Sequence, residues 1–304
     1  MESEFVNWLR ARVPSHPLVP IGIGDDAALL SLASGKCVVT SDMLMDGVDF
    51  VLNDCDPRRI GRKSLAVNLS DLAAMAAKPV AAIVSLAVPT DVSLEVMKMI
   101  YEGVLEMADE FGVALAGGDT NSWKHPLAIS VTAIGEPTKR GVLMRGGARA
   151  GDVILVTGQF GGSILGRHFD FRPRVEEALY LHSRYELHGA MDVSDGLSLD
   201  LNRLARESAC GAILDASQVP ISADAYRLSE QNPAKGSPLD HALGDGEDFE
   251  LIIATSPETA EQIVADRSFG VPVTRVGEFI ADPGLWLRSA TGECHPLTPH
   301  GYEH

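Results

Sequence analysis

Basic residues are scarce in this sequence. Its 304 residues include 25 Lys and Arg against 42 Asp and Glu, which gives a formal net charge of −17. Proteins that bind nucleic acids draw much of their affinity from basic side chains on phosphates, so the charge excludes a nucleic-acid partner. An anionic small molecule remains compatible with the composition only if cations neutralise its site first.

Paired cysteines and long apolar runs are lacking too. No C-x-x-C spacing occurs, which predicts free thiols in a reducing compartment for the four cysteines, Cys37, Cys55, Cys210 and Cys294. No uninterrupted apolar run is long enough to span a membrane. The first thirteen residues carry Glu2 and Glu4 and predict an amphipathic helix, not a signal peptide. We therefore expect a cytoplasmic protein without a membrane partner.

Several common nucleotide and metal motifs are missing. Without G-x-x-x-x-G-K-[ST] the chain is not a P-loop enzyme, and without H-R-D or D-F-G it does not have the protein-kinase fold. H-E-x-x-H does not occur, so the scattered histidines predict no zinc site. The glycine-rich segment 157–163 allows two interpretations. It can hold a phosphate at a helix N-terminus or, the favoured alternative, allow a strand and a helix to pack tightly.

Apolar, β-rich runs alternate with helical patterns along the chain. Strands are predicted at 36–41, 80–88, 113–116, 127–134, 153–157, 190–193 and 249–254, and helices at 57–77, 93–111, 173–183, 197–208 and 257–265. This mixture predicts an α/β or α+β protein. Segment 137–152 contains four glycines and four basic residues, so we place a domain boundary near residue 138, with domains 1–138 and 139–304.

Aspartates follow several apolar strands. Asp42, Asp119 and the pair Asp192 and Asp195 come at or just after such runs, and Asp26 ends a glycine-rich apolar segment. Ligand sites in α/β folds form at strand ends, whereas a single aspartate can equally cap a helix or form a turn. The repetition favours a shared ligand site.

Asp71 lies in an otherwise apolar and small-residue segment. On a continuous helix, Asn68 and Asp71 would share one face, and a buried carboxylate there is costly unless it is paired or bound to a metal. The alternative is a helix break that Ser70 or Asp71 caps. Converging carboxylates without Cys or His favour Mg²⁺ or a similar hard cation.

Seven motifs occur in an order that resembles the thiamine-monophosphate kinases, a branch of the aminoimidazole ribonucleotide synthetase-like superfamily. They are 22–27, 40–42 followed by 47–50, 66–75, 117–120, 145–152, 192–197 and 246–251. A single motif such as G-G-D-T carries little weight, but seven in order across nearly the whole chain are highly specific.

The resemblance implies a two-domain α/β (α+β) fold of the aminoimidazole ribonucleotide synthetase type. Its N-terminal domain binds ATP and Mg²⁺ and pairs into a barrel across a homodimer, and its C-terminal domain is α/β. It also implies that ATP phosphorylates thiamine monophosphate to thiamine diphosphate with several Mg²⁺ ions. The alternatives are a superfamily enzyme that uses ATP on another acceptor, or a non-catalytic nucleotide-binding regulator.

The resemblance assigns site residues motif by motif. The implied Mg²⁺ ligands are Asp26, Thr40, Ser41, Asp42, Asp71, Asp119, Asp192 and Asp195. The implied ATP contacts are Tyr101, Gly118, Asp119, Arg145 and Ser194, and Glu247 would face the thiamine end of the acceptor. Asp42, Asp119 and Arg145 are the predicted catalytic residues. The acceptor oxygen is already anionic, so positioning and charge stabilisation, not a general base, are what the reaction needs.

Two positions depart from the family pattern. Asp49 stands where the family usually has a histidine near the substrate. It can bind a further Mg²⁺, contact the cationic thiazolium ring, indicate a different acceptor, or be a tolerated surface variation. The tail also differs, so Tyr302 is the candidate for an aromatic contact with the thiamine rings.

Overall fold

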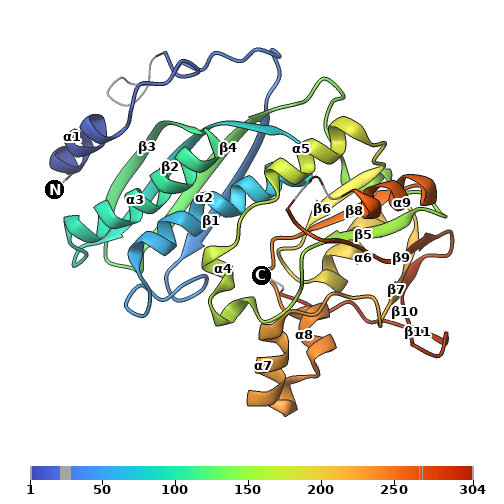
Figure 1. Ribbon diagram of the computed structural model, residues 1–304. Coiled ribbons are helices and arrows are strands. Elements are labelled where there is room, and N and C mark those ends of the chain that lie inside the picture. The colour runs from blue at the N-terminus through green and yellow to red at the C-terminus, as the bar shows by residue number, and fades with distance from the viewer. Residues whose placement is uncertain (1, 21–28, 267, 269, 303–304) are drawn as a thin grey trace. The chain divides into compact units, whose positions relative to one another are not determined.

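The chain forms two compact units. The computed structural model describes residues 2–20, 29–266, 268 and 270–302 (Figure 1). Unit 1 comprises Met1–Leu72 and Ala77–Pro137, and unit 2 comprises Ala73–Ala76 and Thr138–His304. Unit 1 therefore ends next to the boundary expected near residue 138. The predicted ligand Asp26 lies outside the described residues.

Unit 1 is built on a four-stranded sheet in the order β1-β4-β2-β3. The strands are β1 (Val38–Met45), β2 (Lys78–Pro89), β3 (Ala114–Trp123) and β4 (Ala128–Glu136). Strand β4 runs antiparallel to β1 and β2, whereas β2 and β3 are parallel. Asp42 pairs with Val131 and Asp119 pairs with Ser85, so both aspartates lie inside strands. The prediction that they follow strand ends is wrong, because pairing with a neighbour extends each strand beyond its apolar run.

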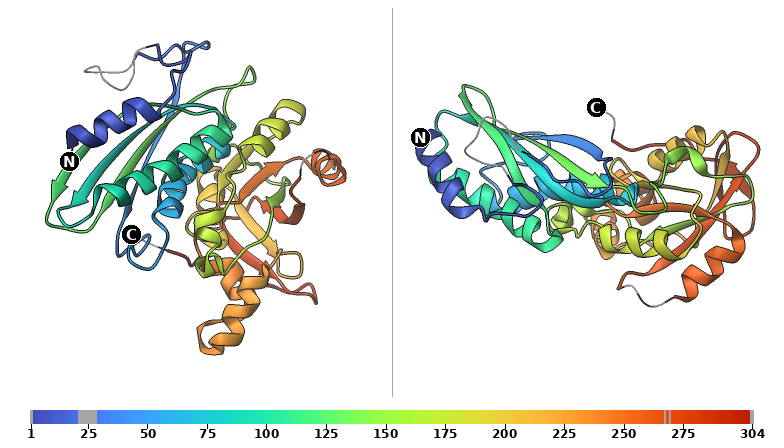
Figure 2. Two further views of the ribbon diagram at one scale, coloured as in Figure 1. Left: turned by 60° about the vertical axis from the view of Figure 1, so that its left-hand side comes forward. Right: turned by 90° about the horizontal axis from the view of Figure 1, so that it is seen from above.

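Two long helices, α2 (Pro57–Ala74) and α3 (Leu94–Phe111), lie along one face of this sheet (Figures 1 and 2). Ser93 caps the start of α3 by accepting from the Val96 amide. The two helices approach backbone to backbone at Gly61, where a Cβ would lie 1.7 Å from the Ile100 carbonyl oxygen. Because of this close approach, a residue with a side chain does not fit at Gly61.

Helix α2 is continuous through the segment where a break was considered. It extends to Ala74, so Asn68 and Asp71 lie on one helix, three residues apart. Asn68 is fully buried and donates to the Ser64 carbonyl. The alternative of a helix capped anew at Ser70 or Asp71 is therefore excluded.

Helix α1 (Glu2–Arg12) belongs to unit 1 as predicted from the N-terminal pattern. Phe5 is fully buried, and its ring meets Tyr101 of α3 edge-on at 5.1 Å between centroids. Arg12 forms a two-pronged ion pair with Glu102 of the same helix α3. Both contacts attach α1 to α3.

Unit 2 contains a seven-stranded sheet in the order β11-β10-β7-β9-β5-β8-β6. The strands are β5 (Val153–Thr157), β6 (Gly189–Asp192), β7 (Gly211–Asp215), β8 (Leu251–Thr255), β9 (Val273–Ile280), β10 (Gly284–Arg288) and β11 (Cys294–Pro296). Strands β5, β6 and β8 confirm three predicted strands, and β7, β9, β10 and β11 had not been predicted. All pairs are antiparallel except β7 with β10.

Helices complete unit 2 around one apolar core. They are α4 (Arg167–Asp170), α5 (Val175–Arg184), α6 (Leu197–Glu207), α7 (Ala223–Gln231), α8 (Pro238–Gly244) and α9 (Pro257–Ala265), with short 3₁₀ turns at Arg145–Gly147, Ser163–Leu165 and Pro233–Lys235. Leu197, Leu201 and Leu204 bury one face of α6 in the core, at the spacing that predicted this helix. Helices α5, α6 and α9 confirm predicted helices.

The cysteines agree with the prediction made from their spacing. All four cysteines carry free thiols. None of the helices in the described part of the chain is long and apolar enough to cross a membrane.

Candidate metal and substrate sites

Three predicted ligands come together in unit 1. Alternation along β1 leaves Thr40 and Asp42 half-buried, whereas Ser41 is exposed on the other face. The Thr40 hydroxyl donates to the carboxylate of Asp71, which α2 contributes. Asp42 lies close enough to Asp71 for their charges to interact. We call Thr40, Asp42 and Asp71 the acidic group of unit 1.

Asp42 is poorly accommodated by the protein alone. Burial is the main cause that raises the pKa of Asp42 to about 7, and the charges of Asp71 and Asp49 add to it. Its Oδ2 atom is buried and accepts no hydrogen bond from the described residues. A carboxylate oxygen in that position is costly unless a cation meets it. This oxygen-only donor set therefore fits a hard divalent cation such as Mg²⁺.

Asp49 has a structural role beside this group. Its carboxylate accepts a hydrogen bond from the Met45 amide at 2.7 Å and closes the turn after β1. Its carbonyl accepts from the ammonium group of the buried Lys63 at 2.9 Å. Asp49 also contributes to the raised pKa of Asp42, so its carboxylate lies near the acidic group.

Ser41 and Asp119 point to the face of the same sheet that lies opposite the face of Asp42. Cross-strand register aligns Asp119 with Ser85, Ser130 and Met43, whereas Asp42 aligns with Val131. Paired residues point to the same face, so Asp42 and Asp119 point to different faces. Among the described residues, no three acidic, histidine or cysteine side chains are grouped closely enough to hold one ion. The full eight-residue ligand set remains a prediction.

Two predicted ATP contacts have a packing explanation. A Cβ on Gly118 would lie 1.9 Å from the Val84 carbonyl oxygen, so only glycine lets β3 approach β2 here. Tyr101 is 3% exposed, and its hydroxyl donates to the same carbonyl at 3.3 Å. This burial argues against a contact between Tyr101 and a nucleotide.

In unit 2, backbone hydrogen bonds bring three predicted motifs together. The Glu247 amide donates to the Ser194 carbonyl at 2.6 Å, and the Phe249 amide donates to the Val193 carbonyl at 2.8 Å. The Tyr302 amide donates to the Asp195 carbonyl at 2.9 Å. These contacts place three distant segments, 192–196, 246–250 and 300–302, around the buried end of β6 at Asp192.

Sequence reasoning missed two residues that organise this loop. Asp200 is fully buried and accepts from the amides of Asp195 and Gly196 at 2.9 and 3.2 Å. Arg203 pairs with both Asp195 and Asp200. Burial is the main cause that raises the pKa of Asp200 to about 6, although Arg203 opposes it. The i, i+3 spacing of Asp200 and Arg203 on a predicted helix was the available signal.

Arg145 and Glu247 occupy different environments in unit 2. Arg145 is exposed at the start of a 3₁₀ turn, and its guanidinium makes no ion pair within the described part of the chain. The Glu247 side chain is 30% exposed, and its Oε2 atom lies 3.1 Å from Nδ1 of His168. The contacts of both residues with substrates stay predictions.

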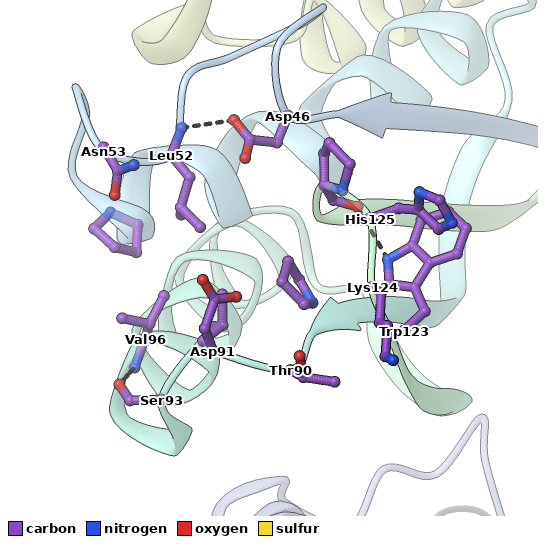
Figure 3. A pocket seen from close by; sticks show the side chains of 14 residues that line it. Asp46, Leu52, Asn53, Thr90, Asp91, Ser93, Val96, Trp123, Lys124 and His125 are labelled. Atoms are coloured by element: carbon purple, nitrogen blue, oxygen red, sulfur yellow. Dashed lines mark hydrogen bonds between the residues drawn. The ribbon is translucent and has the colours of Figure 1, made fainter.

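Unit 1 also contains a pocket of about 720 Å³ to which the sequence did not point (Figure 3). Its walls include Asp46, Asp91, Lys124 and His125, and none of the predicted site residues lines it. Trp123 lines the pocket and donates its indole N–H to the Pro126 carbonyl at 3.0 Å. The mixed charges of the walls indicate no single class of ligand.

Comparison with known protein families defines the class of the chain. The N-terminal domain of AIR synthase related proteins matches residues 24–136, and their C-terminal domain matches residues 149–288. The chain thus has the two-domain, mixed α/β architecture of that class.

Individual relatives narrow the class. The thiamine-monophosphate kinase of Rhodopirellula baltica is 44% identical, over 100% of this chain and 97% of its own length. The crystal structure of thiamine-monophosphate kinase from Stenotrophomonas maltophilia K279a is 34% identical with a TM-score of 0.80, covering 94% of this chain and 95% of that one. AaThiL complexed with AMPPCP and TMP is 25% identical with a TM-score of 0.78, covering 100% and 95%. The chain belongs to the thiamine-monophosphate kinase family, which confirms the resemblance found in its motifs.

Proposed function

We propose that this protein transfers the terminal phosphoryl group of ATP to thiamine monophosphate, which yields thiamine diphosphate and ADP. The observation that carries the proposal is the 44% identity to a thiamine-monophosphate kinase along the whole chain. The related AaThiL structure holds AMPPCP, an ATP analogue, together with TMP. Donor and acceptor of the proposed reaction thus correspond to the ligands of that relative.

Mg²⁺ is the cation that the acidic group of unit 1 would hold. The hydroxyl of Thr40 and the carboxylates of Asp42 and Asp71 offer oxygen ligands only. When bound, Mg²⁺ would neutralise charge on the phosphates. Asp42 and Asp71 would hold the positive ion in place, and its charge would relieve the repulsion between the two carboxylates.

Arg145 would stabilise the charge that spreads over the transferring phosphoryl group. Its guanidinium is exposed and is not committed to an ion pair with any other described residue. A guanidinium offers two parallel donors to phosphate oxygens, which fits this role. No residue needs to remove a proton from the acceptor, because its phosphate oxygen is already ionised.

Further ligands are proposed on separate parts of the chain. Ser41 and Asp119 on the sheet of unit 1, and Asp192 and Asp195 on the loop of unit 2, would be further Mg²⁺ ligands. Gly118, Asp119 and Ser194 would contact ATP. Glu247 and Tyr302 would contact the thiamine moiety from the segments that hydrogen bonds join to that loop. Asp49 already closes a turn, so its replacement of the family histidine does not by itself call for a different acceptor.

A homodimer completes the proposal. The exposed face of β1 presents Val39, Met43 and Met45, which are 56%, 58% and 41% exposed. Apolar side chains in a row on an edge strand favour association with a second sheet. Pairing of two N-terminal sheets into a barrel would cover these three side chains.

The pairing is tested by the variant Met43→Lys. It should shift the molar mass measured by light scattering from that of a dimer to that of a monomer, whereas an unchanged mass would contradict this pairing.

The reaction is tested directly with purified protein, ATP, Mg²⁺ and thiamine monophosphate, followed by chromatographic detection of thiamine diphosphate. Product that requires both substrates and disappears with EDTA supports the proposal. Tight ATP binding without product would point to another acceptor, and Asp49→His then becomes the informative variant. If that variant gains turnover, the position has drifted from the family's specificity.

A further inference from the structure

The segment that carries Glu247 has an unfavourable backbone. Glu247 has a φ of 63° and Phe249 a φ of 50°, although neither is glycine. Left-handed conformations of residues with side chains cost free energy and persist only where the surroundings impose them. The contacts of segment 246–250 must therefore offset this strain.

Buried carboxylates anchor the segment on both sides of Phe249. Both oxygens of Asp248 accept from the Gly161 amide, at 2.9 and 3.1 Å, and Oδ1 pairs with Arg167 at 2.5 Å. Glu250 accepts from the Thr157 hydroxyl at 2.6 Å and from two nitrogens of Arg174. Both side chains are almost completely withdrawn from solvent. Their partners come from the glycine-rich segment 157–163 and the residues after it.

The glycine-rich segment has a packing role. A Cβ on Gly158 would lie 2.0 Å from the Glu250 carboxylate, and one on Gly161 would lie 2.7 Å from the Ala242 amide nitrogen. Gly158 therefore lets the segment approach Glu250 closely, and Gly161 lets it pack against the backbone of α8. These contacts support tight packing, which was the favoured of the two interpretations of segment 157–163.

Helix α4 connects these anchors to Glu247. Arg167 donates to the carbonyls of Gln159 and Gly161 besides pairing with Asp248. The next residue, His168, is 5% exposed and places Nδ1 at 3.1 Å from Oε2 of Glu247. Arg167 and His168 of α4 thus contact Asp248 and Glu247 of the strained segment. Asp248 is buried, whereas Glu247 is partly exposed.

We propose that Arg167 and His168 are positioning residues that hold the Glu247 carboxylate in place and thereby set the affinity for the acceptor. The inference rests on the proposed function, in which Glu247 faces the thiamine moiety. Neither residue contacts the reacting phosphates in this assignment. Their loss should therefore weaken acceptor binding more than it slows phosphoryl transfer.

Variants at His168 test the surface half of this arrangement. His168→Ala removes the donor, and His168→Asn retains an N–H near the position of Nδ1. We expect His168→Ala to raise the KM for thiamine monophosphate about tenfold, while kcat and the KM for ATP change less than about twofold. His168→Asn should restore most of the lost affinity. Calorimetry of thiamine monophosphate binding without ATP provides a second readout.

A double-mutant comparison of His168 with Glu247 distinguishes a positioning role of His168 from a general loss of structure. In a Glu247→Ala background, His168→Ala should have no further effect on the KM, because the group that it positions is gone. Arg167→Met should also raise the acceptor KM, and Arg172→Met is its control, since Arg172 pairs with Glu176 at the surface. Thermal unfolding of each variant shows whether it is folded.

The outcomes separate the two proposals. If the wild-type protein neither binds nor phosphorylates thiamine monophosphate, the proposed function and the positioning role both fail. If the wild type does both and His168→Ala matches it, the positioning role alone fails. An effect of His168→Ala that persists unchanged in Glu247→Ala, or a fall in kcat with unchanged KM, would also overturn it.

Discussion

The carboxylates of the two units are stabilised in different ways. In unit 2, Asp195 and Asp200 share Arg203, Asp248 pairs with Arg167, and Glu250 pairs with Arg174. In unit 1, the charges that shift the pKa of Asp42 are those of Asp71 and Asp49, which are also negative. Unit 2 thus neutralises these carboxylates with its own arginines, whereas Asp42 would be neutralised only by the cation proposed to bind there.

The largest expected effect is on turnover. Asp42→Asn should lower kcat by at least about 100-fold, because it removes charge that would hold Mg²⁺ at the phosphates. The variant should remain as stable as the wild type, since a buried carboxylate with a raised pKa is removed. Activity and thermal unfolding are measured together. Asp54→Asn, at an exposed aspartate of the same unit, is the matched control, and similar rates for both variants would refute the metal role of Asp42.

Ligand binding should stabilise the protein. Mg²⁺ with an ATP analogue at about 100 times the dissociation constant adds about 2.7 kcal/mol to the free energy of unfolding. Differential scanning fluorimetry should show a higher Tm for the wild type and a smaller shift for Asp42→Asn. Mg²⁺ alone, the analogue alone and EDTA are the controls. Equal shifts in wild type and variant would mean that the cation binds elsewhere.

Loss of an internal cation should destabilise unit 2. Arg203→Met leaves the buried Asp200 without its charged partner, and we expect a loss of about 2 kcal/mol, discounted because the Arg203 side chain is 36% exposed. Arg227→Met breaks a surface pair with Asp224 and should cost less than about 0.5 kcal/mol. Urea unfolding compares the two variants. A second change, Asp200→Asn, should recover part of the Arg203→Met loss, and no recovery would contradict the pairing.

Glu177 is an intermediate case and should show the smallest effect. Burial is the main cause that raises the pKa of Glu177, and Arg174 is 3.9 Å away. The pKa of Glu177 is higher in the folded state than its ordinary value of 4.5, which applies in the unfolded state. The contribution of Glu177 to the free energy of unfolding is therefore fully present below pH 4.5 and is lost as the pH rises through the raised pKa. Wild type should therefore lose stability relative to Glu177→Gln as the pH rises above 4.5, which urea unfolding at a series of pH values measures. A constant difference would show that Glu177 does not titrate as inferred.

Local patterns were sufficient for many elements of the fold. The apolar spacing of α6 and the run of β5 indicated these elements, because their residues alternate or recur with the period of the structure that they form. Strand β9 was not recognised, since its burial depends on neighbours from distant parts of the chain. The ends of β1 and β3 were misjudged for the same reason.

The candidate sites show the same division. The motif order alone led to the family, and the comparison with known kinases confirms it. Arg167 and His168 were not recognised, because the carboxylates that they meet lie about 80 residues further along the chain. Arg203 was missed although its i, i+3 spacing from Asp200 was a local signal. Tyr101 was assigned to the nucleotide, although packing against Phe5 buries it.

The sequence by itself determined the class of fold, the family and the acidic residue types that favour a hard cation, because these properties lie in periodicity, motif order and composition. Only the tertiary structure decided which carboxylates are paired with arginines and which are left to repel each other. A carboxylate's pKa depends on burial and on charges within a few ångströms, and the fold alone brings such groups together from distant parts of the chain. Burial raises the pKa of both Asp42 and Asp248, to about 7 and about 8, but the neighbouring charge of Asp71 adds to the first shift whereas that of Arg167 opposes the second.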